Sequence, residues 1–275
     1  MILTHGSEYV LVDLLLRTLR KLKSQRYAAQ FPHTMFGSAR VIDTRDEEGL
    51  PIRVLEVGGG WQSACYRGDG WGELVFGYHR IYRYVTSLFS PPRHVLMLGG
   101  GAYSWPIWLL THLGDCRVDV VEVDPQITKI ARDYFGLDLL DERCGGPDAG
   151  GRLRSLAMDA RKFLEKEGPD RYDLICNDCF SGQEPVMSLL GPDAARRVHR
   201  LLEDQGGCYL SNVVSALEGP ESALLREACS NLGEVFSHVY VLPCGADEPY
   251  DQDNNVVVAT DSPLELPGSY PLFDK

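Results

Sequence analysis

The sequence predicts an α/β fold with a mostly parallel seven-stranded sheet that ends in an antiparallel hairpin. Between residues 95 and 214, apolar strand-like segments alternate with helix-like segments, and this alternation is typical of a parallel sheet covered by helices. The last two apolar segments, HVYVLPC (238–244) and NNVVVATD (254–261), are joined by a loop that is too short for a crossover and forces an antiparallel pair. A glycine triplet at 99–101 closes the first strand, which indicates a tight turn where a ligand approaches the backbone.

Three regions are expected along the chain: an N-terminal amphipathic helix within 1–37, a small β unit with a connecting helix over 38–92, and a Rossmann-like domain over 93–275. Residues 8–29 place apolar residues on one side and gather Lys and Arg late in the run, as in a helix with cations near its C-terminus. Short β-rich pieces between Gly, Pro and Asp-Glu turn signals fill 38–76; they indicate antiparallel strands. The segment YHRIYRYVTSLF (78–89) predicts a helix that PPRH ends.

The core domain is expected to alternate strands and helices in order. Strands are predicted at 95–101, 117–124, 153–160, 173–178 and 203–214, and helices at 105–113, 125–137 and 160–168. Pro125 suits the first turn of its helix. Five parallel strands followed by an antiparallel hairpin are typical of class I AdoMet-dependent transferases. A dinucleotide dehydrogenase more often continues with parallel strands, so an NAD oxidoreductase is the least favoured enzyme class.

The amino-acid composition limits which binding partners and which cellular compartment are expected. The 275 residues, 44% of them hydrophobic, suffice for one core domain with a small appendage. A formal charge of −12 disfavours nucleic acid and anionic lipid and attracts a cationic substrate such as a polyamine. We find no signal peptide and no apolar run of membrane-spanning length, so no membrane contact is expected. Eight cysteines, scattered except for the C-x-x-C pair Cys176 and Cys179, indicate reduced thiols and a cytoplasmic location.

The glycine turn and the second strand form the candidate nucleotide site. Gly99, Gly100 and Gly101 leave room for a ligand at the backbone, and Glu122 ends the second strand about 20 residues later. A carboxylate at that place accepts hydrogen bonds from both ribose hydroxyls. This spacing does not separate NAD from an adenosyl sulfonium donor. Asp124, two residues on, is expected to cap the helix that Pro125 begins.

The later strand ends supply two more carboxylates. Asp159 ends the third strand, where it either accepts a hydrogen bond from an adenine amino group or caps the next helix. Asp178 ends the fourth strand at the edge where ligands bind in open α/β folds. There it orients an attacking amine and accepts the proton that the amine, with a pKa near 10, loses before attack. Tyr78 and His79 either contact the amine or the donor, or pack between the β unit and the core.

These residues resemble the spermidine/spermine synthase (polyamine aminopropyltransferase) family over roughly 53–261. The family pattern of GGGDG, an acidic-hydrophobic-Asp triplet, Asp-Ala and DSSDP reads here as LGGGAYS, EVD, MDA and NDCFSG. Gln62, Tyr78 and His79 resemble the family's Gln and its Tyr-Gln or Tyr-His pair. Met97, two positions before the first glycine, is similar to the synthases, because methyltransferases usually carry an acidic residue there.

The resemblance implies a role for each candidate. It gives the catalytic step to Asp178 and Tyr78, and donor binding to Gln62, the three glycines, Glu122 and Asp159. His79 and Ser181 would contact the substrate. Two positions depart from the pattern: Ala102 replaces the Asp that pairs with the aminopropyl ammonium, and Ser181 replaces the second Asp of DSSDP.

The expected reaction is aminopropyl transfer from decarboxylated AdoMet to an amine acceptor in a metal-free, homodimeric enzyme of a divergent branch. Two alternatives stay open. A small-molecule methyltransferase would use intact AdoMet, which Ala102 suits better than Asp would. A non-catalytic adenosyl-binding homologue would keep the donor pocket and lose the amine site.

Overall fold

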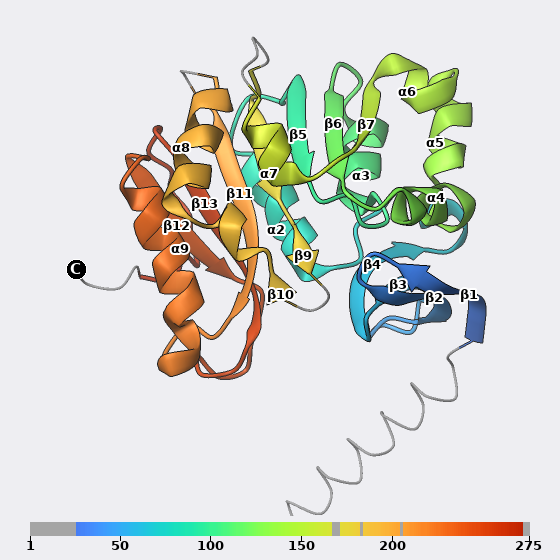
Figure 1. Ribbon diagram of the computed structural model, residues 1–275, viewed down its shortest axis with the longest axis horizontal. Helices are drawn as coiled ribbons and strands as arrows, with labels where there is room; N and C mark the ends of the chain where they lie inside the picture. The colour runs from blue at the N-terminus through green and yellow to red at the C-terminus, as the bar shows by residue number, and fades with distance from the viewer. Residues whose placement is uncertain (1–25, 167–170, 182–183, 204–205, 272–275) are drawn as a thin grey trace, which may run out of the picture.

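Two β-sheets, one large and one small, make up the chain in a computed structural model that describes residues 26–166, 171–181, 184–203 and 206–271 (Figure 1). The large sheet has the strand order β12-β13-β11-β8-β5-β6-β7. Its strands are β5 (His94–Leu98), β6 (Arg117–Glu122), β7 (Leu153–Ala157), β8 (Leu174–Asn177), β11 (Cys208–Ser215), β12 (His238–Pro243) and β13 (Asp253–Thr260). The strands β7, β6, β5, β8 and β11 run parallel, and β13 is antiparallel to both β11 and β12. The predicted mostly parallel sheet with a terminal antiparallel hairpin is confirmed.

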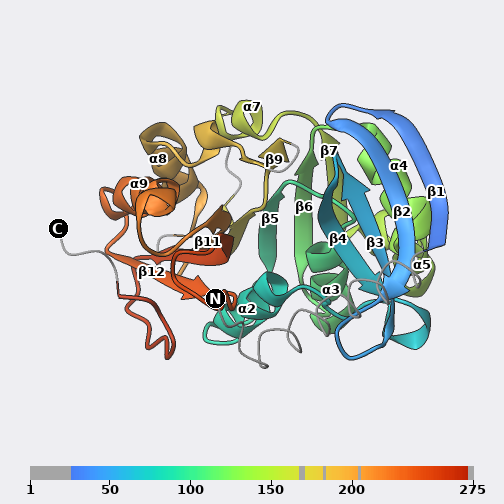
Figure 2. The same ribbon diagram turned by 90° about the horizontal axis from the view of Figure 1, so that it is seen from below.

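Helices cover both faces of the large sheet (Figure 2). One face packs against α2 (Gly77–Thr86), α3 (Ser104–His112) and α5 (Leu137–Cys144), and the other against α7 (Ala160–Leu164), α8 (Pro192–Leu201) and α9 (Ala223–Gly233). The remaining elements are α4 (Pro125–Tyr134), α6 (Pro147–Gly151), the short strands β9 (Phe180–Ser181) and β10 (Glu184–Pro185), and the 3₁₀ turns η1 (Gly68–Gly70), η2 (Met187–Leu189) and η3 (Pro220–Ser222). The central strands β5, β6, β8 and β11 are buried on both faces, as a doubly covered parallel sheet requires.

The small sheet is antiparallel, with the order β1-β2-β3-β4. Its strands are β1 (Arg26–Thr34), β2 (Gly37–Arg45), β3 (Pro51–Val57) and β4 (Gly60–Tyr66). The sheet therefore starts at Arg26, ahead of the expected boundary at residue 38. The expected helix over 8–29 is wrong at its end, because residues 26–29 pair with β2; the rest of it lies outside the described residues. Backbone pairing with β2 outweighs local helical periodicity at this edge.

The small sheet packs onto the glycine turn and onto α4 of the core domain (Figure 1). Its apolar face, with Val41 and Leu55, is in contact with Ala102 and with Ile127 and Ile130 of α4. At the β1–β2 turn, the Met35 N–H donates to Oδ2 of Asp124 at 2.7 Å. This contact fixes the hairpin over the carboxyl ends of the parallel strands.

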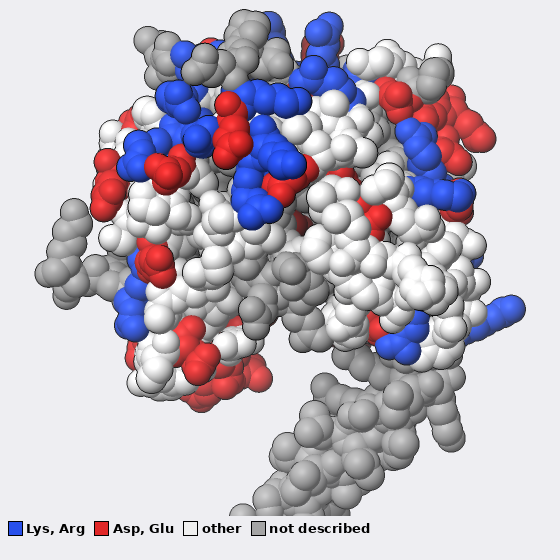
Figure 3. Space-filling model, viewed as in Figure 1, with Lys and Arg blue, Asp and Glu red and all other residues white. Residues whose placement is uncertain are grey.

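Surface charge is uneven despite the net negative total. On the face in Figure 3, Lys and Arg gather over α7 and α8, and α8 contributes Arg196, Arg197 and Arg200 to a shallow hollow there. Acidic side chains form separate clusters elsewhere on the same face. No helix within the described ranges has the length and apolar character needed to cross a bilayer.

Candidate active site

The glycine turn after β5 approaches its neighbours so closely that side chains would not fit. Gly99 has φ +85° and a Cβ there would overlap the carbonyl oxygen of Asp178. Gly101 has φ +49° and its Cβ would lie 2.6 Å from Oγ of Ser63. Glycine is needed at both positions because the left-handed backbone and the close approach exclude other residues. The turn therefore links β5 to the end of β8 and to β4 of the small sheet.

Glu122, at the end of β6, faces the glycine turn. Its Oε2 accepts hydrogen bonds from the N–H groups of Gly100 at 2.9 Å and Gly101 at 3.2 Å, and its Oε1 accepts from Asp124 N–H at 2.9 Å. Burial raises the pKa of Glu122, and these backbone donors oppose the rise. The carboxylate is thus fixed by backbone groups while it lines a cavity at the strand ends.

Two carboxylates cap helices at this edge. Asp124 caps α4, because its Oδ1 accepts from Gln126 N–H at 2.9 Å, as predicted. Asp159 caps α7 through Arg161 N–H at 2.8 Å. The Arg161 guanidinium also pairs with both oxygens of Asp159, and this hydrogen bonding lowers the pKa of Asp159 to about 2. The capping alternative for Asp159 is confirmed, and the carboxylate still reaches the cavity wall.

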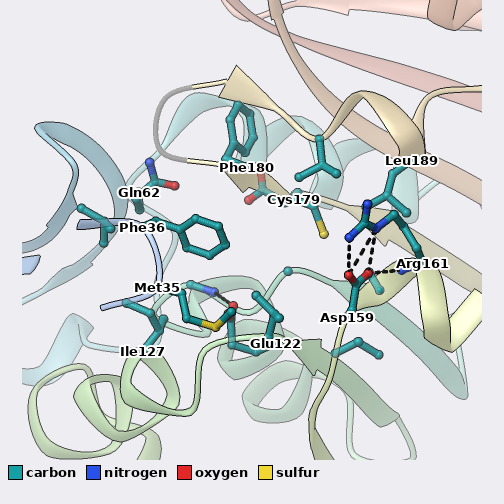
Figure 4. A pocket seen from close by; sticks show the side chains of 18 of the residues that line it. Met35, Phe36, Gln62, Glu122, Ile127, Asp159, Arg161, Cys179, Phe180 and Leu189 are labelled. Carbon is teal, nitrogen blue, oxygen red and sulfur yellow. Dashed lines mark hydrogen bonds and ion pairs between the residues drawn. The ribbon is translucent and has the colours of Figure 1, made fainter. Parts of the chain in front are cut away.

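A cavity of about 360 Å³ opens between the small sheet and the carboxyl ends of the core strands (Figure 4). Phe36 and Gln62 of the small sheet lie on one side, Asp159 and Arg161 on the opposite side, and Glu122 on the floor. The lining comprises Met35, Phe36, Leu55, Val57, Gln62, Gly99, Gly101, Val121, Glu122, Val123, Ile127, Asp159, Ala160, Arg161, Asp178, Cys179, Phe180, Val186 and Leu189. Carboxylates next to apolar walls suit a nucleoside with a charged tail.

Asp178, directly after β8, is held by two hydrogen bonds. The Tyr78 hydroxyl donates to Oδ2 at 2.9 Å and Asn212 Nδ2 donates to Oδ1 at 2.9 Å. Burial raises the pKa of Asp178, and the hydrogen bonds from Asn212 and Tyr78 counteract the rise. A carboxylate with a raised pKa accepts a proton more readily, so this site can act as a general base.

His79 lies behind this pair. The residue is 3% exposed, and its ring packs against that of Tyr78 with centroids 4.1 Å apart. Burial lowers the pKa of His79 to about 3, so the imidazole is neutral. His79 is absent from the walls of both cavities at this edge. Its position therefore fits the prediction that it packs between elements, and not the alternative that it contacts a ligand.

A second cavity of about 360 Å³ adjoins the first on the side of α2. Its walls are Gly60, Trp61, Gln62, Phe76, Gly77, Tyr78, Asp178, Phe180, Asn212, Val214, Cys244, Asp253 and Asn254. Gln62, Asp178 and Phe180 line both cavities. A molecule in each cavity would therefore meet its neighbour at Asp178.

Comparisons with known proteins agree with this geometry. The polyamine aminopropyltransferase of Neisseria meningitidis is 27% identical over 161 residues, which cover 58% of this chain and 57% of that protein. Polyamine aminopropyltransferase 2 of Streptomyces coelicolor is 40% identical over 142 residues, 52% of this chain and 24% of that protein. A probable spermidine synthase structure from Corynebacterium glutamicum superposes with a TM-score of 0.68 at 21% identity, covering 86% of this chain and 81% of that one.

The chain is thus similar in sequence to polyamine aminopropyltransferases and in fold to spermidine synthases. No family model matches it. The chain spans less than two thirds of the length of the Neisseria relative, 57%. The solved synthase structures confirm the class I AdoMet-dependent transferase fold.

Two departures from the aminopropyltransferase pattern have clear locations. Ala102 is fully buried against the small sheet and its N–H donates to Oγ of Ser63 at 3.0 Å. It is absent from the walls of both cavities, so it contributes to packing. Ser181 lies in β9, beside Phe180.

Several wall residues escaped the sequence analysis. Arg161, Asn212 and Asp253 have no recognisable motif, because each reaches the site only through the packing of its own element. The strand register explains how Asn212 reaches the site. Ser211 on β11 pairs with Asn177 on β8, so the residues that follow them, Asn212 and Asp178, lie side by side. Phe180 lies within the motif NDCFSG, but an apolar side chain there gives no signal of a binding role.

Proposed function

We propose that this protein transfers an aminopropyl group from decarboxylated AdoMet to an amine acceptor. The observation that carries the proposal is the position of Asp178, which lines both cavities and is the meeting point of the two. A donor in the first cavity and an amine in the second would bring nucleophile and electrophile together at one buried carboxylate. Names of the relatives as polyamine aminopropyltransferases support the same reaction.

The charge of the donor cavity favours a cationic donor. Three carboxylates line this cavity, those of Glu122, Asp159 and Asp178. The cavity wall has one cation, Arg161, and its guanidinium already pairs with Asp159. Decarboxylated AdoMet carries two positive groups, a sulfonium and an ammonium. Intact AdoMet has a carboxylate in addition, which the carboxylates of the cavity would repel. The cavity therefore suits a methyltransferase, which would bind intact AdoMet, less well than an aminopropyltransferase.

The chain's own residues position the donor. The glycine turn accommodates the nucleoside, and Glu122 Oε1, which accepts a single backbone hydrogen bond, has a lone pair left for a ribose hydroxyl. Asp159 presents its carboxylate to the base edge, and Gln62 borders the reacting end from the side of the small sheet.

The reaction requires that the acceptor amine lose a proton and attack in line with the bond that breaks. Asp178 accepts the proton, and the nitrogen lone pair attacks the carbon of the aminopropyl chain that is bonded to sulfur. The N–C bond forms as the C–S bond breaks, and the electron pair neutralises the sulfonium, releasing methylthioadenosine. The protein contributes positioning and charge matching.

Product analysis with purified protein tests the proposal. Decarboxylated AdoMet and 1,4-diaminobutane should yield methylthioadenosine and an aminopropylated amine, detected by mass spectrometry. Calorimetry should show tighter binding of decarboxylated AdoMet than of AdoMet. Tighter binding of AdoMet together with a methylated amine would overturn the proposal, and binding without any turnover would favour the non-catalytic alternative.

We also propose that the enzyme is a cytoplasmic homodimer. Dimers are common in the family that the sequence resembles, and light scattering after gel filtration checks the mass.

A further inference from the structure

The donor cavity has two aromatic side chains, Phe36 and Phe180, among wall residues that all lie in the described ranges. Phe36 stands on the turn between β1 and β2, and its ring points into the cavity from the side of the small sheet (Figure 4). It lies on the same side as Gln62, which lines both cavities, and opposite Asp159. The Phe36 ring therefore faces the end of the donor cavity that adjoins the acceptor site.

The turn that carries Phe36 is fixed by hydrogen bonds. The Phe36 N–H donates to Oγ1 of Thr34 at 3.2 Å. The neighbouring Met35 N–H donates to Oδ2 of Asp124, whose own N–H donates to Oε1 of Glu122. The ring is partly buried and packs against the apolar cluster between the small sheet and α4. Phe36 is thus held in a defined position relative to the carboxylate on the cavity floor.

The carboxylates of the cavity are largely committed to other partners. Asp159 pairs with Arg161, and Glu122 accepts three backbone hydrogen bonds. Asp178 lies at the junction of the cavities, where the proposed function gives it to the acceptor amine. Ala102, which stands where the resembled pattern has an Asp, is buried and absent from the wall. An aromatic face is a further group that attracts a desolvated cation.

The proposed binding mode brings the sulfonium to the side of Phe36. With the base edge at Asp159 and the ribose at Glu122, the 5′ substituent of the nucleoside extends away from Asp159, towards Phe36 and Gln62. The carbons bonded to the sulfonium share its positive charge and can lie against the electron-rich face of a phenyl ring.

We propose that Phe36 binds the sulfonium of the donor through a cation–π contact and thereby distinguishes the charged donor from its neutral thioether product. This inference rests on the proposed function, from which it takes the orientation of the donor. During transfer the C–S bond breaks and its electron pair stays on sulfur, so the sulfonium becomes a thioether. The contact weakens as that charge disappears, which favours donor binding and product release.

Two ligands that differ by one methyl group and one charge test the assignment. They are decarboxylated AdoMet and its thioether without the sulfonium methyl group, 5′-deoxy-5′-(3-aminopropylthio)adenosine. In calorimetry, Phe36→Leu, which keeps an apolar side chain, should lower the affinity for decarboxylated AdoMet by about 10-fold and that for the thioether by less than about 2-fold. Phe36→Tyr keeps the ring and should bind decarboxylated AdoMet within about 3-fold of the wild type.

Phe31→Leu is the matched control. Phe31 lies on β1 of the same hairpin, and its ring packs edge-on against Tyr134, with centroids 6.0 Å apart. It is absent from the walls of both cavities, so this variant should bind both ligands within about 2-fold of the wild type. Equal losses for the two ligands in Phe36→Leu, or unchanged affinity for decarboxylated AdoMet, would overturn the inference.

The measurement needs no acceptor, so it separates this inference from the proposed function. If Phe36→Leu loses affinity for the sulfonium ligand alone but the wild type aminopropylates no amine, the proposed reaction falls and the inference stands. If the wild type forms the aminopropylated product but the variant loses affinity equally for both ligands, the reaction stands and the role of Phe36 falls. Failure of the wild type to bind either ligand would overturn both.

Discussion

The Tyr78 hydroxyl donates a hydrogen bond of 2.9 Å to Oδ2 of Asp178, which joins helix α2 to the end of strand β8. Tyr78 is 5% exposed, and burial, followed by the charge of Asp178, raises its own pKa well above the ordinary value. The phenol therefore remains a donor at physiological pH. This bond orients the carboxylate at the junction of the two cavities.

Asp178→Asn should reduce turnover by about 100-fold or more, because the amide cannot accept the amine's proton. Affinity for methylthioadenosine should stay nearly intact, since the residue borders the donor cavity without closing the glycine turn. Turnover assays and calorimetry with methylthioadenosine check both parts. Equal turnover in the wild type and the variant would remove Asp178 from the mechanism.

Stability supplies the folding control for that variant. Burial raises the pKa of Asp178 in the folded state, so the folded protein favours the protonated form. Stability is then highest below the unfolded pKa and falls as pH rises through the folded pKa. At pH 7 the Asp178→Asn protein should have a higher thermal midpoint than the wild type, with the gap closing towards pH 4. A lower midpoint at pH 7 would contradict this account.

Tyr78→Phe should shift the acid limb of the kcat/KM profile to higher pH. The Tyr78 hydrogen bond lowers the pKa of Asp178, so its removal raises that pKa and more alkaline conditions are needed to ionise the base. Turnover at pH 8 should fall by about 10-fold from lost orientation. Tyr82→Phe is the control, since its hydroxyl faces the carbonyl oxygen of Asn177 at 3.4 Å. An unshifted limb in Tyr78→Phe would contradict the role of the bond.

Gly99→Ala should destabilise the fold by about 2 kcal/mol or more. The new Cβ would overlap the carbonyl oxygen of Asp178, at a backbone with φ +85°. Chemical denaturation measures the loss, and activity should fall with it because Asp178 is displaced. Gly114→Ala is the matched control, since its Cβ would meet nothing within 4 Å. Equal stability of the two variants would show that the turn has room to relax.

Asp159→Asn should weaken methylthioadenosine binding by about 10-fold, because the variant loses the acceptor proposed for the adenine amino group and the ion pair with Arg161. Asn retains the cap of α7, so the fold should lose little stability. With its pKa at about 2, Asp159 is ionised at all ordinary pH values, and wild-type donor affinity should show no titration from it between pH 5 and 9. Unchanged affinity in the variant would restrict Asp159 to capping.

Local signals predicted the core domain well. The apolar strand segments, the turn at the glycines and the short loop before β13 each reflect a local physical requirement: backbone burial, a positive φ or a limit on chain reach. Residues 26–29 lie in β1 and not in the predicted helix, because their partner strand, β2, imposes pairing on residues whose own periodicity is helical. The sequence analysis predicts neither α8 nor α9, although together with α7 they cover one face of the large sheet.

Sequence alone determined the elements that end at the carboxyl edge of the sheet, namely the glycine turn, Glu122, Asp159 and Asp178, because the end of an apolar strand segment and the chemistry of the turn after it are local. Tertiary structure decided which side chains share a cavity. His79 directly follows Tyr78 in sequence, yet it is buried and absent from the cavity walls, whereas Asp253, from the last strand, lines the second cavity. The physical reason is that β13 inserts between β11 and β12, and no local pattern records which distant strand end it joins.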